Sequence, residues 1–238
     1  MLPIGDNIPG RNPPIATWLL IIVNGLVFVV ELALPPPARE AFLHLFGLVP
    51  ARADYWPLLT SMFIHAGWLH IIANLWTLWI FGDNVEDRMG PVRFVIFYLL
   101  CGLAGNLLHW FMYPESTLPA VGASGAIAGV LGAYFVLFPL ARVIVFLPVL
   151  FVPFFFELPA VTYLALWALS QFWSGTLALA LPQDVGGIGW WVHVGGFVAG
   201  VALHFFFVRS GRRERRTARD QYGMDAAWVP SSHWRKER

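Results

Sequence analysis

The sequence predicts an all-α, polytopic membrane protein: a six-transmembrane-helix bundle with an interfacial helical loop between spans one and two. Of its 238 residues, 58% are hydrophobic and only 12% are charged, whereas a soluble domain carries roughly 25% charged residues. Six apolar segments approach the length of about 20 residues that crosses a bilayer. The single cysteine, Cys101, excludes a scaffold stapled by disulfides within the chain.

The expected spans are bounded by prolines, glycines or charged residues, and they cover approximately 16–34, 67–82, 92–113, 124–138, 158–179 and 189–208. An alternative count of seven makes 143–156 a span of its own, although it is short for that purpose. Residues 38–48 have apolar side chains at helical spacing, which predicts a short helix in the membrane interface. The predicted organisation is a cytoplasmic segment 1–15, a membrane domain 16–208 and a basic cytoplasmic tail 209–238.

Charge predicts the orientation of these spans. Residues 1–208 contain 6 basic and 10 acidic residues, whereas residues 209–238 contain 9 basic and 4 acidic ones. Basic residues beside a span favour the cytoplasmic side. We therefore expect both termini of a six-span chain in the cytoplasm. The tail is interpreted as a signal of topology and lipid attraction, and not as a nucleic-acid site.

Four polar residues in the spans form a set. His70 and Asn74 share one face of span two, Ser124 opens span four, and His193 lies near the start of span six. These three spans run in the same direction, so the four side chains are expected at one depth below the outer surface. A polar side chain inside a bilayer costs free energy, so it is usually paired or has a function. Hydrogen bonds to neighbouring helices are sufficient for the other main candidates, which are Asn24, Asn106, His109, Ser170, Gln171 and His204.

Span four predicts a cavity and a close helix pair. From Ser124 to Phe138 it is about 22 Å long, against a hydrocarbon core of about 30 Å. The preceding segment must therefore dip into the membrane, which is tolerated beside a water-filled cavity. Glycines four residues apart, at Gly125 and Gly129 and at Gly196 and Gly200, allow spans four and six to approach closely.

This set of residues fits acyl transfer. A serine hydroxyl becomes a nucleophile when a base such as histidine removes its proton. The Ser124 N–H, the Asn74 amide and His70 are plausible donors to the oxyanion. No carboxylate is evident beside His193, and Asp184 in the preceding loop is too far out. The sequence therefore favours a Ser124–His193 pair without a third member.

These residues resemble the motifs of the rhomboid family of intramembrane serine proteases. Gly122-Ala-Ser124-Gly125 is similar to its GxSG element, and His70 with Asn74 to its HxxxN element. The run from His193 through Gly196 to Gly200 is similar to its HxxGxxxG element, and Glu86-Asp-Arg88-Met-Gly90 to its ExRxG turn after span two. The family often has Trp-Arg in the outer loop, where this chain has Trp56-Pro57.

The resemblance implies roles for each residue. Ser124 would be the nucleophile and His193 the base, with Asn74, His70 and the Ser124 N–H as the oxyanion hole. The expected structural supports are His65, Gly122, Gly125, Gly196 and Gly200. Residues 158–179 would form a lateral gate for single-pass membrane protein substrates, which would be cut near the outer end of their helix. No metal or other cofactor is implied, and the membrane would be a bacterial plasma membrane.

Three rival hypotheses remain open at this point. A transporter would bind an anion at the broken helix that begins at Ser124, and a rhomboid-like binding protein would lack catalysis. A metal or haem protein would use His65, His70 and His193. However, His65 and His70 are five residues apart and do not share a helix face, and the chain has no HExxH pattern.

Overall fold

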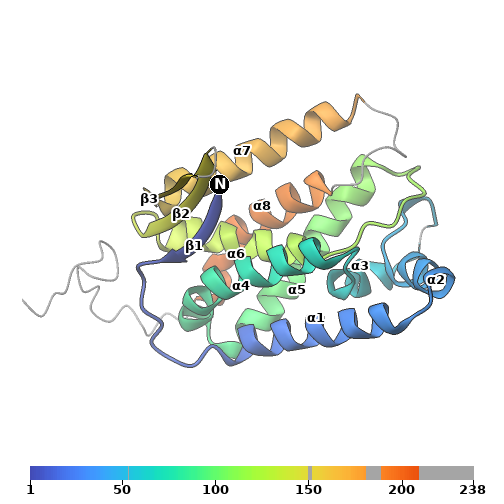
Figure 1. The fold of residues 1–238 in the computed structure, drawn as a ribbon, viewed down its shortest axis with the longest axis horizontal. Coiled ribbons are helices and arrows are strands. Elements are labelled where there is room, and N and C mark those ends of the chain that lie inside the picture. The colour runs from blue at the N-terminus through green and yellow to red at the C-terminus, as the bar shows by residue number, and fades with distance from the viewer. Residues whose placement is uncertain (53, 150–151, 181–188, 209–238) are drawn as a thin grey trace, which may run out of the picture.

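The computed structural model describes residues 1–52, 54–149, 152–180 and 189–208, and Figure 1 shows its mainly helical architecture. The predicted basic tail and Asp184 lie outside the described residues. Each long helix overlaps an expected apolar segment: α1 (Ile15–Ala33), α4 (Trp68–Met89), α5 (Pro91–Met112), α6 (Ser124–Leu137), α7 (Ala160–Ala178) and α8 (Trp190–Phe207).

A series of short helices joins α1 to α4. The expected interfacial helix is present as α2 (Pro36–Phe46), which Figure 1 places at one end of the bundle. It is followed by the short turns η1 (Pro50–Arg52), α3 (Pro57–Thr60) and η2 (Ser61–Phe63). Helix α4 is longer than expected and includes Glu86, so the chain turns only at Gly90, where φ is 81°.

Length and hydropathy support an integral membrane protein. In the part of the chain that the structure describes, α1, α5 and α8 each meet the requirements for a membrane span. The segment Pro57–Phe63 and α4 meet them together but are bent by 91°. Helix α6 is apolar and short, as expected for a helix that does not cross the full hydrocarbon layer alone.

The structure differs from the all-α prediction by a three-stranded sheet. Strands β1 (Leu2–Asp6), β2 (Arg142–Val149) and β3 (Val152–Pro159) pair antiparallel in the order β1-β2-β3. The seven-span alternative is therefore wrong, because 143–156 forms most of the β2–β3 hairpin. Pro148 and Pro153 face each other near its end, and proline is tolerated in strands at such margins.

Strand β1 is attached to the helix bundle by hydrogen bonds. The Asp6 carboxylate accepts hydrogen bonds from Tyr134 Oη at 2.7 Å and from Asn84 Nδ2 at 2.9 Å. Trp76 Nε1 donates to the Pro3 carbonyl at 2.7 Å. Residues 2–6 of the expected N-terminal segment therefore lie along α4 as a strand.

Glu86 holds the start of α1 against α4. Its carboxylate accepts hydrogen bonds from the backbone N–H groups of Ala16 and Thr17 at 2.9 and 2.8 Å, and from Thr17 Oγ1 at 2.8 Å. The first N–H groups of a helix lack intrahelical partners, and a negative charge is favourable there. The Glu86–Gly90 motif thus serves the packing of these helices.

Helix α8 packs against both α5 and α6. A Cβ atom added at Gly196 would overlap the carbonyl oxygen of Gly125, and one added at Gly200 would overlap that of Gly129. The predicted close approach of these two helices is confirmed. It fixes the start of α8 beside the start of α6.

Candidate active site

Ser124 and His193 are brought together by the close packing of α6 and α8. Ser124 is the first residue of α6, and His193 lies in the first turn of α8. Ser124 Oγ is 2.8 Å from His193 Nε2. This is hydrogen-bond distance, as a hydroxyl and the base that removes its proton require.

The second ring nitrogen of His193 contacts α7. His193 Nδ1 is 2.7 Å from Gln171 Oε1. The sequence predicts that Gln171 only makes a hydrogen bond to a neighbouring helix. It makes such a bond, but the neighbour is the imidazole of His193. The sequence does not indicate that Gln171 bonds to His193, because the rotation of α7 relative to α8 determines which side chain the amide meets.

A cavity of about 590 Å³ opens beside this pair. Its walls come from α4, α5, α6, α7, α8, the segment before α6 and the start of the chain. Among the lining residues are all four members of the predicted set, namely His70, Asn74, Ser124 and His193. The structure therefore brings the set together around one space.

Two of these residues present donors to the cavity. Asn74 Nδ2 donates to the His70 carbonyl at 2.9 Å, and an amide nitrogen has a second hydrogen to give. The backbone N–H of Ser124 belongs to the first turn of α6, where N–H groups lack intrahelical partners. The His70 ring lies against Gly122, where an added Cβ would be 2.6 Å from Nε2.

Comparison with known proteins assigns the family. The family model of the Rhomboid domain matches residues 52–210. The chain belongs to the rhomboid family. It is 30% identical over 179 residues to RHOMBOID-like protein 6, mitochondrial, of Arabidopsis thaliana, covering 73% of this chain and 51% of that protein.

Two further relatives come from a bacterium and a yeast. Rhomboid protease GluP of Bacillus subtilis is 34% identical over 127 residues, covering 52% of this chain and 24% of that protein. Rhomboid protein 1, mitochondrial, of Saccharomyces cerevisiae is 29% identical over 161 residues, covering 66% of this chain and 43% of that protein. The present rhomboid spans about half or less of the length of these three relatives.

Gly122 shapes the backbone that leads to Ser124 in this rhomboid. Its φ of 125° is a conformation that favours glycine. Its N–H donates to the Ser61 carbonyl at 2.9 Å. Because a side chain would also meet His70, Gly122 is needed both for the turn and for the space.

His65 lies behind the cavity and not in its wall. Its side chain is fully buried, and its ring meets that of His70 edge to face, with 5.2 Å between the centroids. The backbone N–H of His65 donates to Glu31 Oε1 at 3.1 Å. The supporting role of His65 stays a prediction, and its position does not favour the metal hypothesis. Among the described residues, no group of three His, Cys, Asp or Glu could hold a metal ion.

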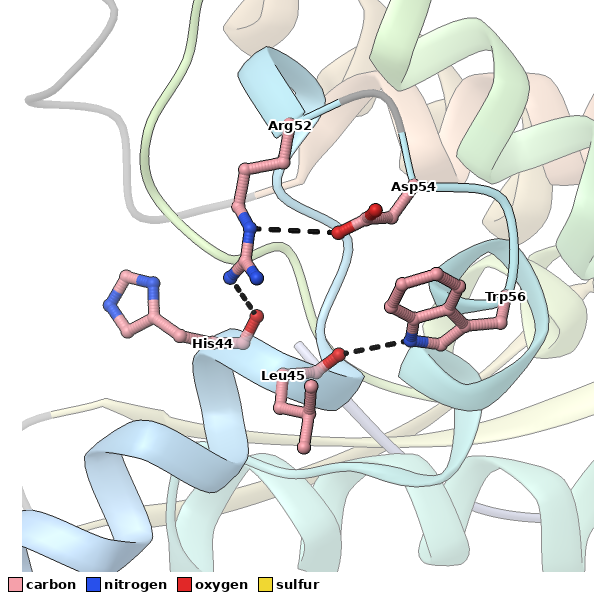
Figure 2. A network of polar contacts seen from close by, with 5 residues as sticks. All are labelled: His44, Leu45, Arg52, Asp54 and Trp56. Carbon is pink, nitrogen blue, oxygen red and sulfur yellow. Dashed lines mark hydrogen bonds and ion pairs between the residues drawn. The ribbon is translucent and has the colours of Figure 1, made fainter.

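An arginine holds the connection after α2, although Pro57 stands in the position where the family often has arginine. Figure 2 shows Arg52 donating to the His44 carbonyl at 2.8 Å and pairing with Asp54 at 3.6 Å. Trp56 Nε1 donates to the Leu45 carbonyl at 3.2 Å. This connection is attached in turn to the segment before Ser124 by a backbone bridge between Leu48 and Ala120.

Three of the remaining polar candidates make hydrogen bonds, whereas the buried Nδ1 of a fourth, His109, has no hydrogen-bond partner among the described residues. Asn106 Nδ2 donates to the Leu58 carbonyl and to Ser61 Oγ at 2.8 and 2.9 Å, which fixes the chain before α4 to α5. Asn24 Nδ2 and His204 Nδ1 are bonded to carbonyls of their own helices. The predicted bond to another segment is therefore found for Asn106, whereas the prediction was wrong for Asn24 and His204, which bond within their own helices.

Proposed function

We propose that this rhomboid is an intramembrane serine endopeptidase that cuts single-pass membrane proteins near the outer end of their transmembrane helix. One observation carries the proposal: Ser124 Oγ lies 2.8 Å from His193 Nε2 in the wall of the cavity. Family membership supports intramembrane proteolysis in general. The name of GluP as a protease agrees with it.

In the proposed acylation step, His193 Nε2 takes the hydroxyl proton while Ser124 Oγ attacks the carbonyl carbon of the substrate. A tetrahedral intermediate forms, with negative charge on the former carbonyl oxygen. His193 then gives its proton to the leaving amine, and the acyl group remains on Ser124. A water molecule repeats the sequence with His193 as base and releases the acid product.

The proposed oxyanion hole consists of the Ser124 N–H, the free hydrogen of Asn74 Nδ2 and the His70 ring. Donors that are already in place stabilise the developing charge without having to reorganise. Asn74 is fixed by its bond to the His70 carbonyl. The positive end of the α6 dipole adds to this stabilisation, because the oxyanion would form at the start of that helix.

The proposed membrane arrangement has six spans, formed by α1, α4, α5, α6, α7 and α8, with both termini in the cytoplasm. The basic residues of 209–238 support this orientation. We propose a bacterial-type plasma membrane, and GluP of Bacillus subtilis is a bacterial relative that supports this proposal. The relatives named mitochondrial make a mitochondrial membrane the alternative.

The proposed substrate route lies between α4 and α7, because both helices line the cavity. Met1 and Pro3 also line the cavity, so the start of the chain would have to move aside for a substrate. A peptide bond in a transmembrane helix is hydrogen-bonded and shielded. The outer end of the substrate helix must therefore unwind before Ser124 reaches it. Helix-breaking residues at the cleavage site would speed this step.

A serine-directed fluorophosphonate probe tests the proposal without knowledge of the substrate. In the purified full chain, we expect the probe to label Ser124. We expect Ser124→Ala and His193→Ala to abolish both labelling and cleavage of a reporter single-pass protein in liposomes. Ser174→Ala, on α7 and outside the cavity lining, is the matched control and should behave like the parent. A parent chain that is folded but neither labelled nor able to cleave would favour a transporter or a binding protein.

A further inference from the structure

The hydrogen bonds around Gln171 determine which ring nitrogen of His193 carries the proton. Ser170 Oγ donates to the Trp167 carbonyl at 2.6 Å, so its oxygen is available to accept from Gln171 Nε2 at 3.0 Å. This directs the other end of the amide, Oε1, toward His193 Nδ1 at 2.7 Å. An amide oxygen only accepts hydrogen bonds. His193 Nδ1 must therefore be the protonated nitrogen, which leaves Nε2 bare to accept the proton of Ser124.

We propose that Gln171 is the positioning residue of a Ser124–His193–Gln171 arrangement in which a neutral amide takes the place usually held by a carboxylate. The inference rests on the proposed protease function and deepens it. Neither α7 nor α8 contains an acidic residue. Gln171 is only 7% exposed, so water does not compete strongly for the bond. The amide acts by holding the tautomer and the plane of the imidazole, and it adds no negative charge.

The location of Gln171 connects catalysis to the position of α7. The Trp167 ring lies 6.0 Å from the His193 ring on the same helix face, so α7 both covers the base and orients it. If α7 moves away to admit a substrate helix, the bond between Gln171 and His193 breaks. Efficient cleavage then requires α7 to return against α8 with the substrate in place. A bound substrate that keeps α7 displaced would be cut more slowly.

Two substitutions of Gln171 separate this role from simple packing. Gln171→Met retains the volume and removes the acceptor. We expect labelling of Ser124 by the fluorophosphonate probe to become about 10- to 100-fold slower, which is the loss typical when the partner that orients a metal-ligating histidine is removed. In cleavage of the reporter protein, kcat should fall while KM stays near the parent value, because the amide does not touch the substrate.

Gln171→Glu retains the acceptor and adds a negative charge. A carboxylate beside an imidazole favours its protonated form, typically by 1–3 pH units. The labelling rate at high pH should therefore stay within a fewfold of the parent rate, while the pH at which labelling is half-maximal moves upward by about one unit or more. A packing role alone would not produce this shift.

The outcomes separate the two proposals. If Gln171→Met labels at the parent rate with the parent pH midpoint, or if Gln171→Glu shows no shift, Gln171 does not position the base, although Ser124 and His193 remain the proposed pair. If Gln171→Met does not fold, the pH profile of Gln171→Glu still decides. Failure of the protease proposal looks different, because Ser124 would then stay unlabelled in every chain, including the parent, and the inference would fall with it.

Discussion

Helices α7 and α8 lie side by side and each contributes one side chain to the proposed hydrogen-bonded chain, but they are held in different ways. Helix α8 meets α6 through backbone: the space at Gly196 is filled by the Gly125 carbonyl. Helix α7 meets α8 through side chains, such as the Phe172 ring at 5.8 Å from the Trp191 ring. Figure 1 shows α7 at the edge of the bundle.

This difference separates a fixed half of the site from an adjustable one. Backbone-to-backbone packing allows few alternative arrangements, whereas aromatic side chains can change rotamer one at a time. Both helices expose large apolar side chains, such as Trp173 of α7 at 66% and Phe205 of α8 at 77%, but α8 also packs closely against both α5 and α6. Elements with fewer buried contacts open at lower free-energy cost. The proposed nucleophile and base therefore belong to the fixed half, and the proposed positioning residue to the adjustable one.

The largest expected effect comes from breaking the fixed half with Gly196→Ala. The new methyl group would overlap the Gly125 carbonyl oxygen, which is backbone and cannot rotate away. We expect a loss of about 3 kcal/mol or more in unfolding free energy, at the upper end for overpacking, together with loss of Ser124 labelling. Unfolding in detergent and probe labelling measure the two effects.

Gly25→Ala is the matched control for this substitution. Gly25 lies in the middle of α1, and a Cβ there would meet nothing within 4 Å. Alanine favours a helix over glycine by about 1 kcal/mol, so this variant should be as stable as the parent or more stable. If Gly196→Ala behaves like Gly25→Ala, α8 is not held by backbone contact and the comparison with α7 fails.

Asn74→Ala tests a part of the fixed half that does not depend on α7. The Asn74 amide is held by its own helix, through the His70 carbonyl. Loss of one oxyanion donor typically lowers kcat by about 10²- to 10³-fold, and we expect a reduction of this size with an unchanged pH profile. Kinetics on the reporter protein would show it.

Thr77→Ala provides the control for Asn74→Ala. Thr77 also lines the cavity from α4, and its hydroxyl makes the same kind of bond to the carbonyl four residues earlier, that of Ala73, at 2.8 Å. It should cut at nearly the parent rate. Equal losses in the two variants would mean that Asn74 only supports the helix.

The positions of the long helices were predictable because apolar segments of about 20 residues and their boundaries are local features. The approach of α6 and α8 was predictable from glycines four residues apart. The β2–β3 hairpin was not, because a short apolar run does not distinguish a strand from a buried helix. The strand that completes this sheet, β1 (Leu2–Asp6), pairs with residues more than a hundred positions away, which no local pattern indicates.

Gln171 shows where sequence reasoning about the site ends. Ser124 and His193 belong to motifs with fixed spacing, whereas Gln171 lies 22 residues before His193 in a helix without a motif. The hydrogen-bond partner of Gln171 depends on how α7 is rotated about its axis. This rotation cannot be predicted from the sequence, because α7 has apolar side chains on all of its faces.

Ser170→Ala is expected to give the smallest effect, because Ser170 acts on His193 only indirectly, through Gln171. Without the Ser170 hydroxyl, Gln171 Nε2 loses its partner at 3.0 Å, and the amide becomes free to turn its nitrogen toward His193 Nδ1. One neutral hydrogen bond contributes about 0.5–1.5 kcal/mol, so Ser124 labelling should slow by about 2- to 10-fold with stability almost unchanged. Thr176→Ala is the matched control. It also removes a hydroxyl that donates to a carbonyl of α7, that of Phe172, at 2.8 Å, but it does not touch Gln171, so labelling should stay unchanged. Equal rates in both variants and the parent would show that the amide keeps its orientation without Ser170, and that the bond to His193 alone holds it.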